Sequence, residues 1–280
     1  MKYILITGAN GGMGKATVEL FVKNGYRVFA LDKEECAPRE NVIPVRADVT
    51  NERSVAAALE AVSAETPELC GIIHLAGIYM LHSLVEMQPS EFERAFRVNL
   101  GGAFLINRTF LPLMRKGAKI ILLTSELAMR DPLPFTGLYG ITKTALDQYA
   151  YSLRMELQLM GISVSVLRAG AVDTGMIGAS TRALDSFCRN TKLYAVNAKR
   201  FRQIVDSVEA RKIPPAKIAG KLYRIFSRKK PKFGYSINRN PLLILLDILP
   251  KGLRFWIIKK VLSQYGARAN DKRNRNTRLY

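Results

Sequence analysis

Residues 2–14 read KYILITGANGGMG, and this stretch decides how the rest of the chain can fold. A short apolar run at residues 2–6 stops at a glycine-rich turn, and an apolar helical pattern follows over residues 15–24. Glycines leave no Cβ where a pyrophosphate approaches the backbone, and amide groups at a helix N-terminus then bind the anion. We therefore expect a strand, a nucleotide-binding turn and a helix. The residues expected at the nucleotide are Gly8, Asn10, Gly12, Met13 and Gly14.

Short apolar runs alternate with helical patterns along most of the chain. Because these runs are apolar throughout, helices are expected to cover both faces of their sheet. The runs lie at residues 2–6, 27–31, 42–45, 69–75, 119–124, 162–167 and 232–237. The helical patterns lie at residues 15–24, 51–64, 90–114 and 139–160, with an irregular helical region over 174–212. We predict an α/β fold, a Rossmann-type doubly wound parallel sheet of about seven strands, in a single domain over residues 1–240.

A carboxylate follows the second predicted strand. Asp32 stands about 20 residues after the glycines, where such a group accepts hydrogen bonds from the ribose hydroxyls of a dinucleotide. Because a carboxylate repels a 2′-phosphate, Asp32 favours NAD, whereas its neighbour Lys33 leaves NADP as the alternative. Asp48 and Val49, after the third predicted strand, are expected at the adenine ring.

Tyr139 and Lys143 stand four residues apart in a helical pattern, so the phenol and the ammonium share one helix face. A free phenol has a pKa of about 10, and a neighbouring cation favours the phenolate and brings that pKa toward neutral. Such a pair alone is also compatible with a surface contact. Ser125, however, ends an apolar strand, where its hydroxyl can face the same site at the carboxyl edge of the sheet. The three residues together indicate acid–base catalysis.

With these motifs in place, residues 1–175 resemble the short-chain dehydrogenase/reductase family. The resemblance rests on TGANGGMG at residues 7–14, Asp32, Asp48-Val49, Ala76-Gly77, Val98-Asn99, Thr124-Ser125 and Tyr139 with Lys143. It implies that Tyr139 exchanges a proton with the substrate oxygen and that Ser125 binds the same oxygen. It also implies that Lys143 binds the nicotinamide ribose and lowers the pKa of Tyr139, while Asn99 holds a water that links Lys143 to solvent. The hydride itself is carried by the cofactor.

The resemblance implies further cofactor contacts and exposes departures from the family pattern. The implied contacts are Ala76, Gly77, Tyr139, Lys143, Val172 and Thr174. The usual NNAG after the fourth strand reads HLAG at residues 74–77, and the usual proline–glycine after the sixth strand is lost in RAG at residues 168–170. We interpret His74 as a buried strand residue rather than a catalyst. Neither departure removes a catalytic group.

Apolar side chains dominate the segments expected around the substrate, at residues 78–84, 126–135 and beyond 174. They favour a lipophilic alcohol or ketone, such as a steroid, a retinoid-like molecule or a long acyl chain. The alternative is a small polar substrate, with these residues packed in the core or a lid. The residues are Tyr79, Met80, Leu81, Leu127, Met129, Leu133, Phe135, Met176 and Ile177.

Charge is concentrated in the last third of the chain. Residues 1–188 are neutral overall, whereas residues 189–280 carry the whole net charge of +20. Apolar residues alternate with cations over residues 241–265, which predicts amphipathic basic helices that dock on an anionic membrane surface. The alternatives are packing on the enzyme body or a second subunit, or an acidic protein partner; no nucleic-acid-binding module is recognised, and none is expected. Residues 266–280 are predicted to be a disordered basic tail.

The C-terminal region loosely resembles a family subgroup that acts in lipid and steroid metabolism, through PAKIA at residues 215–219 and LPKGLRFW at residues 249–256. Family resemblance also implies a homodimer or homotetramer, paired through helices around residues 99–116 and 139–160. Three scattered cysteines favour a reducing compartment and give no paired metal site. No signal peptide or spanning run is recognised, so we expect a cytoplasmic protein, peripheral on a membrane surface, without a metal.

These features predict an NAD(P)-dependent oxidoreductase acting on CH–OH groups, of the hydroxysteroid dehydrogenase kind. It would move a hydride between nicotinamide and a lipophilic secondary alcohol or ketone, with Tyr139 as the acid or base. Two alternatives stay open. One is a reductase of 3-oxoacyl groups on an acyl carrier protein, which docks on the basic third of the chain. The other is a dinucleotide sensor without catalysis.

Overall fold

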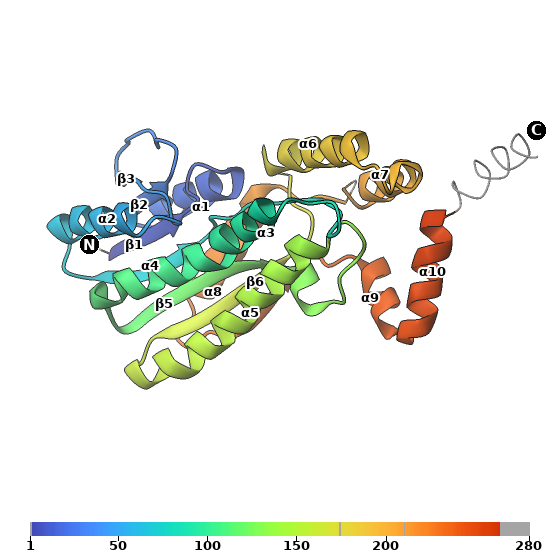
Figure 1. The fold of residues 1–280 in the computed structure, drawn as a ribbon. Helices are drawn as coiled ribbons and strands as arrows, with labels where there is room; N and C mark the ends of the chain where they lie inside the picture. Colours follow the sequence, from blue (N-terminus) through green and yellow to red (C-terminus); the bar gives the residue numbers. More distant parts are fainter. Residues whose placement is uncertain (1, 174, 210, 264–280) are drawn as a thin grey trace, which may run out of the picture.

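A single sheet of seven parallel strands organises residues 2–173, 175–209 and 211–263, the parts of the chain that the computed structural model describes. The spatial order is β3-β2-β1-β4-β5-β6-β7 (Figure 1). The strands are β1 (Lys2–Thr7), β2 (Tyr26–Asp32), β3 (Val42–Arg46), β4 (Leu69–His74), β5 (Met114–Ser125), β6 (Ser163–Ala169) and β7 (Gly234–Ile237). The order reverses between β1 and β4, and ligands of such folds bind at that switch point. The predicted doubly wound α/β fold is confirmed.

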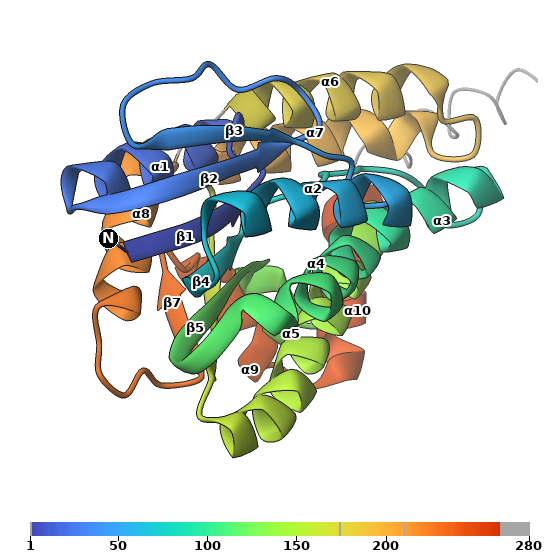
Figure 2. The same ribbon diagram turned by 90° about the vertical axis from the view of Figure 1, so that its left-hand side faces the viewer.

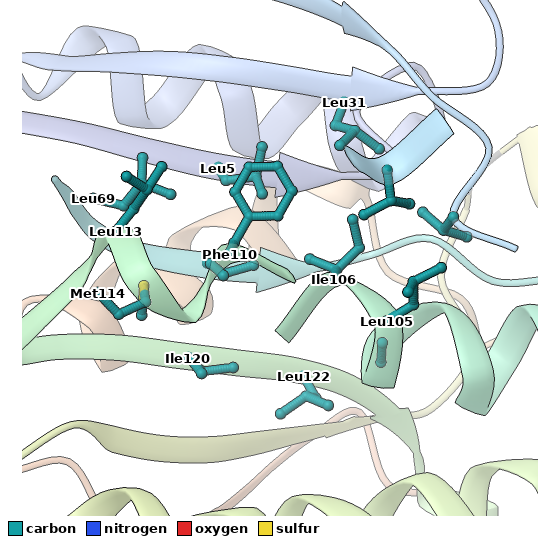
Figure 3. Packing of buried hydrophobic residues seen from close by; sticks show 14 of the residues in the cluster. Leu5, Leu31, Leu69, Leu105, Ile106, Phe110, Leu113, Met114, Ile120 and Leu122 are labelled. Atoms are coloured by element: carbon teal, nitrogen blue, oxygen red, sulfur yellow. The ribbon is translucent and has the colours of Figure 1, made fainter. Parts of the chain in front are cut away.

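Helices cover both faces of the sheet (Figure 2). The helices of the described chain are α1 (Gly12–Lys23), α2 (Glu52–Glu65), α3 (Pro89–Phe96), α4 (Gly102–Phe110), α5 (Gly137–Leu157), α6 (Gly175–Asn190), α7 (Ala195–Glu209), α8 (Pro215–Phe226), α9 (Pro241–Ile248) and α10 (Lys251–Ser263). Side chains alternate between the faces. In β1, Leu5 packs toward α2 and α4, with Ile106 and Phe110 (Figure 3), whereas Ile4 and Ile6 pack toward α1 and α8.

Several helices that follow β6 lie at the end of the molecule toward which the strands run. Figure 1 shows α6, α7, α9 and α10 at that end. The predicted amphipathic region beyond residue 241 is a pair of helices, α9 and α10, divided at Leu249 and Pro250, because a proline cannot continue a helix. Among the residues described, no helix is both long enough and apolar enough to cross a membrane.

Residues 90–114, expected to form one helix, are divided into several elements. A π-helical turn at Arg97–Gly101 separates α3 from α4, and a short 3₁₀ turn that contains Pro112 ends α4. The strand that follows, β5, begins at Met114, earlier than the predicted residue 119. The π turn contains Asn99, and such turns occur frequently at functional sites.

Candidate active site

The turn between β1 and α1 requires its glycines. Gly8 adopts a φ of +67°, and a Cβ at that position would lie 2.5 Å from the amide nitrogen of Ala76. A Cβ at Gly14 would lie 2.1 Å from the carbonyl oxygen of Gly8. Backbone alone therefore forms the cradle at the N-terminus of α1, which suits a dinucleotide pyrophosphate. Gly12 begins α1, Asn10 is half-buried in the turn, and Met13 is buried in the core beneath α1.

Asp32 lies at the carboxyl end of β2, beside the glycine turn. Its Oδ2 accepts a hydrogen bond from the Asn10 amide at 2.9 Å, and its Oδ1 accepts one from the Glu34 amide at 3.1 Å. These bonds hold a carboxylate where the ribose hydroxyls of a dinucleotide would bind. The exposed Lys33 ammonium lies 3.8 Å from the Glu34 carboxylate.

The two residues predicted at the adenine ring follow β3. Asp48 is exposed and accepts hydrogen bonds from the amide and the hydroxyl of Thr50, which lower the pKa of its carboxyl. The side chain of Val49 is buried instead, and a Cβ at Gly102 would lie 2.7 Å from it. Val49 therefore supports the start of α4.

Ser125, Tyr139 and Lys143 come together where β5 ends and α5 begins. Ser125 forms a hydrogen bond with the Tyr139 hydroxyl, and its own oxygen accepts the Leu127 amide at 3.2 Å. The Lys143 ammonium lies 5.8 Å from the centre of the Tyr139 ring and donates to the carbonyl oxygen of Leu123 at 3.2 Å. The structure thus places the phenol and the amine on the same side of α5.

Asn99 braces the segment beside Lys143. Its Oδ1 accepts the Ile78 amide at 2.7 Å, and its Nδ2 donates to the Ile78 carbonyl oxygen and to the Thr142 hydroxyl, both at 3.0 Å. A Cβ at Gly77 would lie 3.2 Å from Asn99 Oδ1 and 3.4 Å from Lys143 Nζ. Gly77 therefore leaves room for the amide and the amine to approach each other beside the end of β4.

Burial shifts the pKa values of both titratable groups. It raises the pKa of Tyr139 to about 12, an effect that the hydrogen bond from Ser125 partly offsets. It lowers the pKa of Lys143 to about 8. At neutral pH the phenol carries its proton and most of the amine carries its charge. Burial thus dominates the pKa of Tyr139, and a lowering by Lys143 stays a prediction.

The departure from the family pattern at residues 74–77 has a structural explanation. His74 is buried in β4, with Nε2 2.8 Å from Oδ1 of Asn107, whose Nδ2 donates to the Tyr149 hydroxyl at 3.1 Å. Burial lowers the pKa of His74 to about 4, so the ring is neutral at physiological pH. The interpretation of His74 as a buried strand residue is confirmed.

The second departure, at residues 168–170, introduces a buried ion pair. Arg168 donates from Nε and Nη2 to the two carboxylate oxygens of Asp147, at 2.9 and 2.7 Å. Asp147 also accepts the Thr124 hydroxyl at 3.1 Å. This pair connects β6 to α5 one turn beyond Lys143. Gly170 remains necessary, because a Cβ there would collide with the carbonyl oxygen of Asn238.

An apolar cluster adjoins Tyr139. The rings of Tyr79 and Tyr139 pack edge to face with their centres 4.7 Å apart. Tyr79 also packs against a cluster that joins the segment after β4 to α6 and α7. The buried members of the cluster are Leu81, Leu184, Phe187, Ala198 and Phe201, with Phe135 packed against them. The predicted wall residues Tyr79, Leu81 and Phe135 therefore belong to one apolar cluster beside Tyr139.

The other predicted wall and cofactor residues lie in different surroundings. Met129 is mostly exposed, while Met80, Leu127 and Leu133 are half-buried. Val172 packs on the core beneath α1 and α8 and forms a bridge with Ile213. Thr174 and the side chains of Met176 and Ile177 lie outside the described residues. Within the described part of the chain, no group of three or more His, Cys, Asp or Glu is placed to hold a metal ion.

Two residues that support the site were not singled out from the sequence. The Thr142 hydroxyl donates to the carbonyl oxygen of Tyr139 at 2.8 Å while it accepts from Asn99. Threonine in a helix commonly bonds back one turn, so its place inside YGITK is a usable signal. Asp147 follows Lys143 by four residues on the same helix face, and that spacing places it toward the sheet.

The chain was compared with known proteins. The sequence model of the short chain dehydrogenase family matches residues 2–185. A 3-ketodihydrosphingosine reductase of Bacteroides thetaiotaomicron is 28% identical over 270 residues, which cover 95% of this chain and 96% of that protein. An estradiol 17-beta-dehydrogenase 2 of Mus musculus is 30% identical over 192 residues, which cover 64% of this chain and 50% of that protein.

Solved structures share the fold. A 3-ketoacyl-(acyl-carrier-protein) reductase from Brucella melitensis, solved with NADH, superposes with a TM-score of 0.69 at 22% identity, covering 84% of this chain and 96% of that one. An aldohexose dehydrogenase from Thermoplasma acidophilum superposes with a TM-score of 0.71 at 20% identity, covering 86% of this chain and 95% of that one.

Proposed function

The chain belongs to the short-chain dehydrogenase family, and on that premise we propose that it transfers a hydride between NAD and a lipophilic secondary alcohol or ketone. It is an oxidoreductase that acts on CH–OH groups and uses a nicotinamide dinucleotide. The observation that carries the finer proposal is the meeting of Ser125, Tyr139, Lys143 and Asn99 beside the glycine cradle.

Each of these side chains has a separate task in the proposed reaction. When bound, the nicotinamide supplies or accepts the hydride. Tyr139 holds a proton at the substrate oxygen, donating it as a ketone is reduced and accepting it as an alcohol is oxidised. Ser125 binds the same oxygen and orients the phenol. The ammonium of Lys143 favours the phenolate through its charge, and Asn99 fixes the backbone at Ile78 beside it.

Replacement of Tyr139 tests this mechanism. In Tyr139→Phe we expect the turnover number to fall by about a hundredfold or more, because the acid–base group is lost. Tyr151→Phe is the matched control, since Tyr151 lies on the same helix with an exposed side chain. The turnover of the two variants is measured with NAD and a panel of long-chain and steroid alcohols and ketones. Undiminished turnover in Tyr139→Phe rejects the mechanism.

NAD is proposed as the dinucleotide because of Asp32. Its carboxylate is fixed by the Asn10 and Glu34 amides, and a 2′-phosphate would meet this negative charge. In Asp32→Asn the preference for NAD over NADP, measured as the ratio of kcat/KM values, should fall by about tenfold or more. The exposed neighbour offers a control in Glu34→Gln. An unchanged ratio in Asp32→Asn contradicts the assignment.

A lipophilic substrate is proposed from the apolar cluster beside Tyr139. Tyr79 and Phe135 are partly buried against the cluster that contains Leu81, and the ring of Tyr79 contacts that of Tyr139. Two relatives are named for a ketodihydrosphingosine and for estradiol, and the first matches nearly the whole chain. We expect kcat/KM to rise with the apolar length of a ketone series. Higher kcat/KM for short polar ketones contradicts this substrate class.

Reduction of 3-oxoacyl groups on an acyl carrier protein is the second candidate, because residues 189–280 carry a net charge of +20 that suits an acidic carrier. Removal of residues 264–280, which carry five of these cations, should then reduce activity on carrier-bound substrates more than on free ones. Equal loss on both substrates argues against docking of the carrier through this segment.

Self-association is proposed through α4 and α5. These helices expose Phe104, Tyr151 and Met155, and such side chains are normally covered. We therefore expect a homodimer or homotetramer, with Phe104→Glu shifting the mass toward the monomer in light scattering. A monomeric wild-type chain rejects this arrangement.

A further inference from the structure

The hairpin formed by α9 and α10 exposes several large apolar side chains. Within α10, which the structure describes in full, Arg254 is the buried residue, and none of the residues of α9 is buried. A helix that packs on its own protein normally turns its apolar stripe inward. This hairpin instead leaves large apolar side chains exposed, although Leu262 at its end packs on the apolar cluster beside α7. The large exposed apolar side chains are Leu242, Leu245, Ile248, Leu253, Phe255 and Trp256.

Charged groups hold the hairpin in this orientation. Arg254 donates to the Asp131 carboxylate at 2.5 Å and to the Asp247 carbonyl oxygen at 3.0 Å. Arg130, in the loop that follows β5, pairs with the Asp247 carboxylate. At the start of α9, the Asn240 amide donates to the Glu126 carboxylate at 2.8 Å. These polar contacts attach the hairpin to the body and leave its six most exposed large apolar side chains in contact with solvent.

The surroundings of the exposed apolar side chains are basic. Over residues 241–263 the chain has four cations and one acid, Asp247. Lys251, Lys259 and Lys260 are exposed on α10, and the Lys260 ammonium lies 4.8 Å from the centre of the Trp256 ring. The partner that fits must therefore accept large apolar side chains and also attract positive charge.

We propose that the α9–α10 hairpin is a docking surface for an anionic lipid bilayer. Such a bilayer offers an apolar interior to leucine, isoleucine and aromatic anchors and negative headgroups to the lysines. A second copy of the chain fits less well, because it presents the same positive charge. An acidic protein would pair with the lysines, but its charge alone gives no reason for six large apolar side chains to be exposed.

Docking in this way brings the catalytic end of the molecule to the membrane. Glu126 directly follows Ser125, and the same loop carries Arg130 and Asp131, so the hairpin is attached to the loop that begins directly after Ser125. A protein docked in this way could receive at Tyr139 a substrate that is dissolved in the membrane. Only this consequence rests on the proposed function. Binding to lipid does not depend on turnover, so a test of binding can succeed or fail independently of the enzymatic proposal.

Trp256 provides a direct probe, because it is the single tryptophan of the chain. The full-length protein is mixed with phosphatidylcholine vesicles, with or without about a third phosphatidylglycerol, and both sedimentation and tryptophan emission are measured. We expect co-sedimentation and a blue shift of the emission with the anionic vesicles, and much less of either with the neutral ones. Binding without a blue shift means that charge alone holds the protein and overturns the proposal.

Two variants separate hairpin insertion from other contacts. Phe255→Glu should weaken binding to the anionic vesicles by about ten- to a hundredfold, since a buried aromatic anchor is lost. Leu159→Glu is the matched control, because Leu159 is even more exposed but lies in the 3₁₀ turn that follows α5. Thermal unfolding confirms that both variants fold. Equal binding by wild type and Phe255→Glu overturns the proposal.

A blue shift that appears without vesicles as the protein concentration rises, together with a higher mass in light scattering, identifies a second copy as the occupant. That result also overturns membrane docking.

Discussion

Two buried cations, Lys143 in the candidate active site and Arg254 in the C-terminal hairpin, differ in whether they have a carboxylate partner. Both are less than a tenth exposed. Lys143 donates to a carbonyl oxygen, and among the described residues no carboxylate lies within ion-pair distance of it. Arg254 contacts the carboxylates of Asp131 and Asp247.

The difference separates a chemical group from a structural one. Without an acid to stabilise its charge, Lys143 has a pKa of about 8, so its charge responds to small changes in its surroundings. A guanidinium keeps its charge at any physiological pH, and with acids on both sides it acts as a permanent connector. In this chain, the buried cation without a carboxylate partner lies in the candidate active site. The buried cation with carboxylate partners attaches the C-terminal hairpin to the body.

The largest expected effect comes from removal of the unpaired cation. Lys143→Met should lower kcat/KM by about a hundredfold or more, because the charge beside Tyr139 is lost. The same change should raise the free energy of unfolding by up to about 3 kcal/mol at pH 7, since burial of that charge is unfavourable. Steady-state kinetics and urea unfolding measure the two effects. Lys251→Met, at an exposed position, should change neither kcat/KM nor the free energy of unfolding. A Lys143→Met variant that is less stable than wild type would show that burial of the Lys143 charge is not unfavourable.

A third buried group, His74, also lacks a carboxylate partner among the described residues, and its effect on stability is expected at acid pH. Its pKa is lowered from 6.5 to about 4, so between these values the unfolded chain binds a proton that the folded chain does not. Stability should therefore fall as the pH drops from 6.5 to 4, by about 3 kcal/mol from this residue.

The variant His74→Gln isolates this contribution. It keeps a donor for Asn107 but cannot titrate, so the difference in unfolding free energy between wild type and variant should shrink as the pH is lowered. A difference that is constant from pH 7 to pH 4 shows that the ring is not held neutral by burial.

Removal of the paired cation should have a smaller effect that is confined to the hairpin. Arg254→Met leaves Asp131 without its partner, but both acids remain partly exposed, so we expect a cost of about 1–2 kcal/mol. Limited proteolysis should then cut within α9 and α10 before the sheet domain. Arg254→Lys, which keeps the charge but loses the planar fork, should fall between wild type and Arg254→Met. Unchanged protease resistance contradicts the role of Arg254 as a connector.

The smallest effect is expected at an exposed pair. The Arg97 and Glu93 side chains lie 3.7 Å apart on the surface, both largely exposed. Glu93→Gln should change the unfolding free energy by less than about 0.5 kcal/mol, because water screens such a pair. A cost as large as that of Arg254→Met would show that burial does not distinguish these ion pairs.

Local patterns predicted the fold and much of the site. The glycines at Gly8 and Gly14 and the spacing of Tyr139 and Lys143 are local features, and the structure places them at the end of the sheet where ligands bind. The division of residues 90–114 was not predicted, because a π-helical turn has no strong signature in a helical pattern. The place of Asn99 in that turn therefore became visible only in the structure.

The amino-acid sequence by itself determined the order of strands and helices, the glycine cradle and the spacing of Tyr139 and Lys143, because each follows from neighbours within a few residues. Only the tertiary structure decided which face of the hairpin is exposed. The periodicity over residues 241–263 shows apolar and basic residues together, but it cannot say which of them turn inward. That choice depends on Glu126, Arg130 and Asp131, more than a hundred residues earlier in the chain, and long-range ion pairs leave no periodic trace in a sequence.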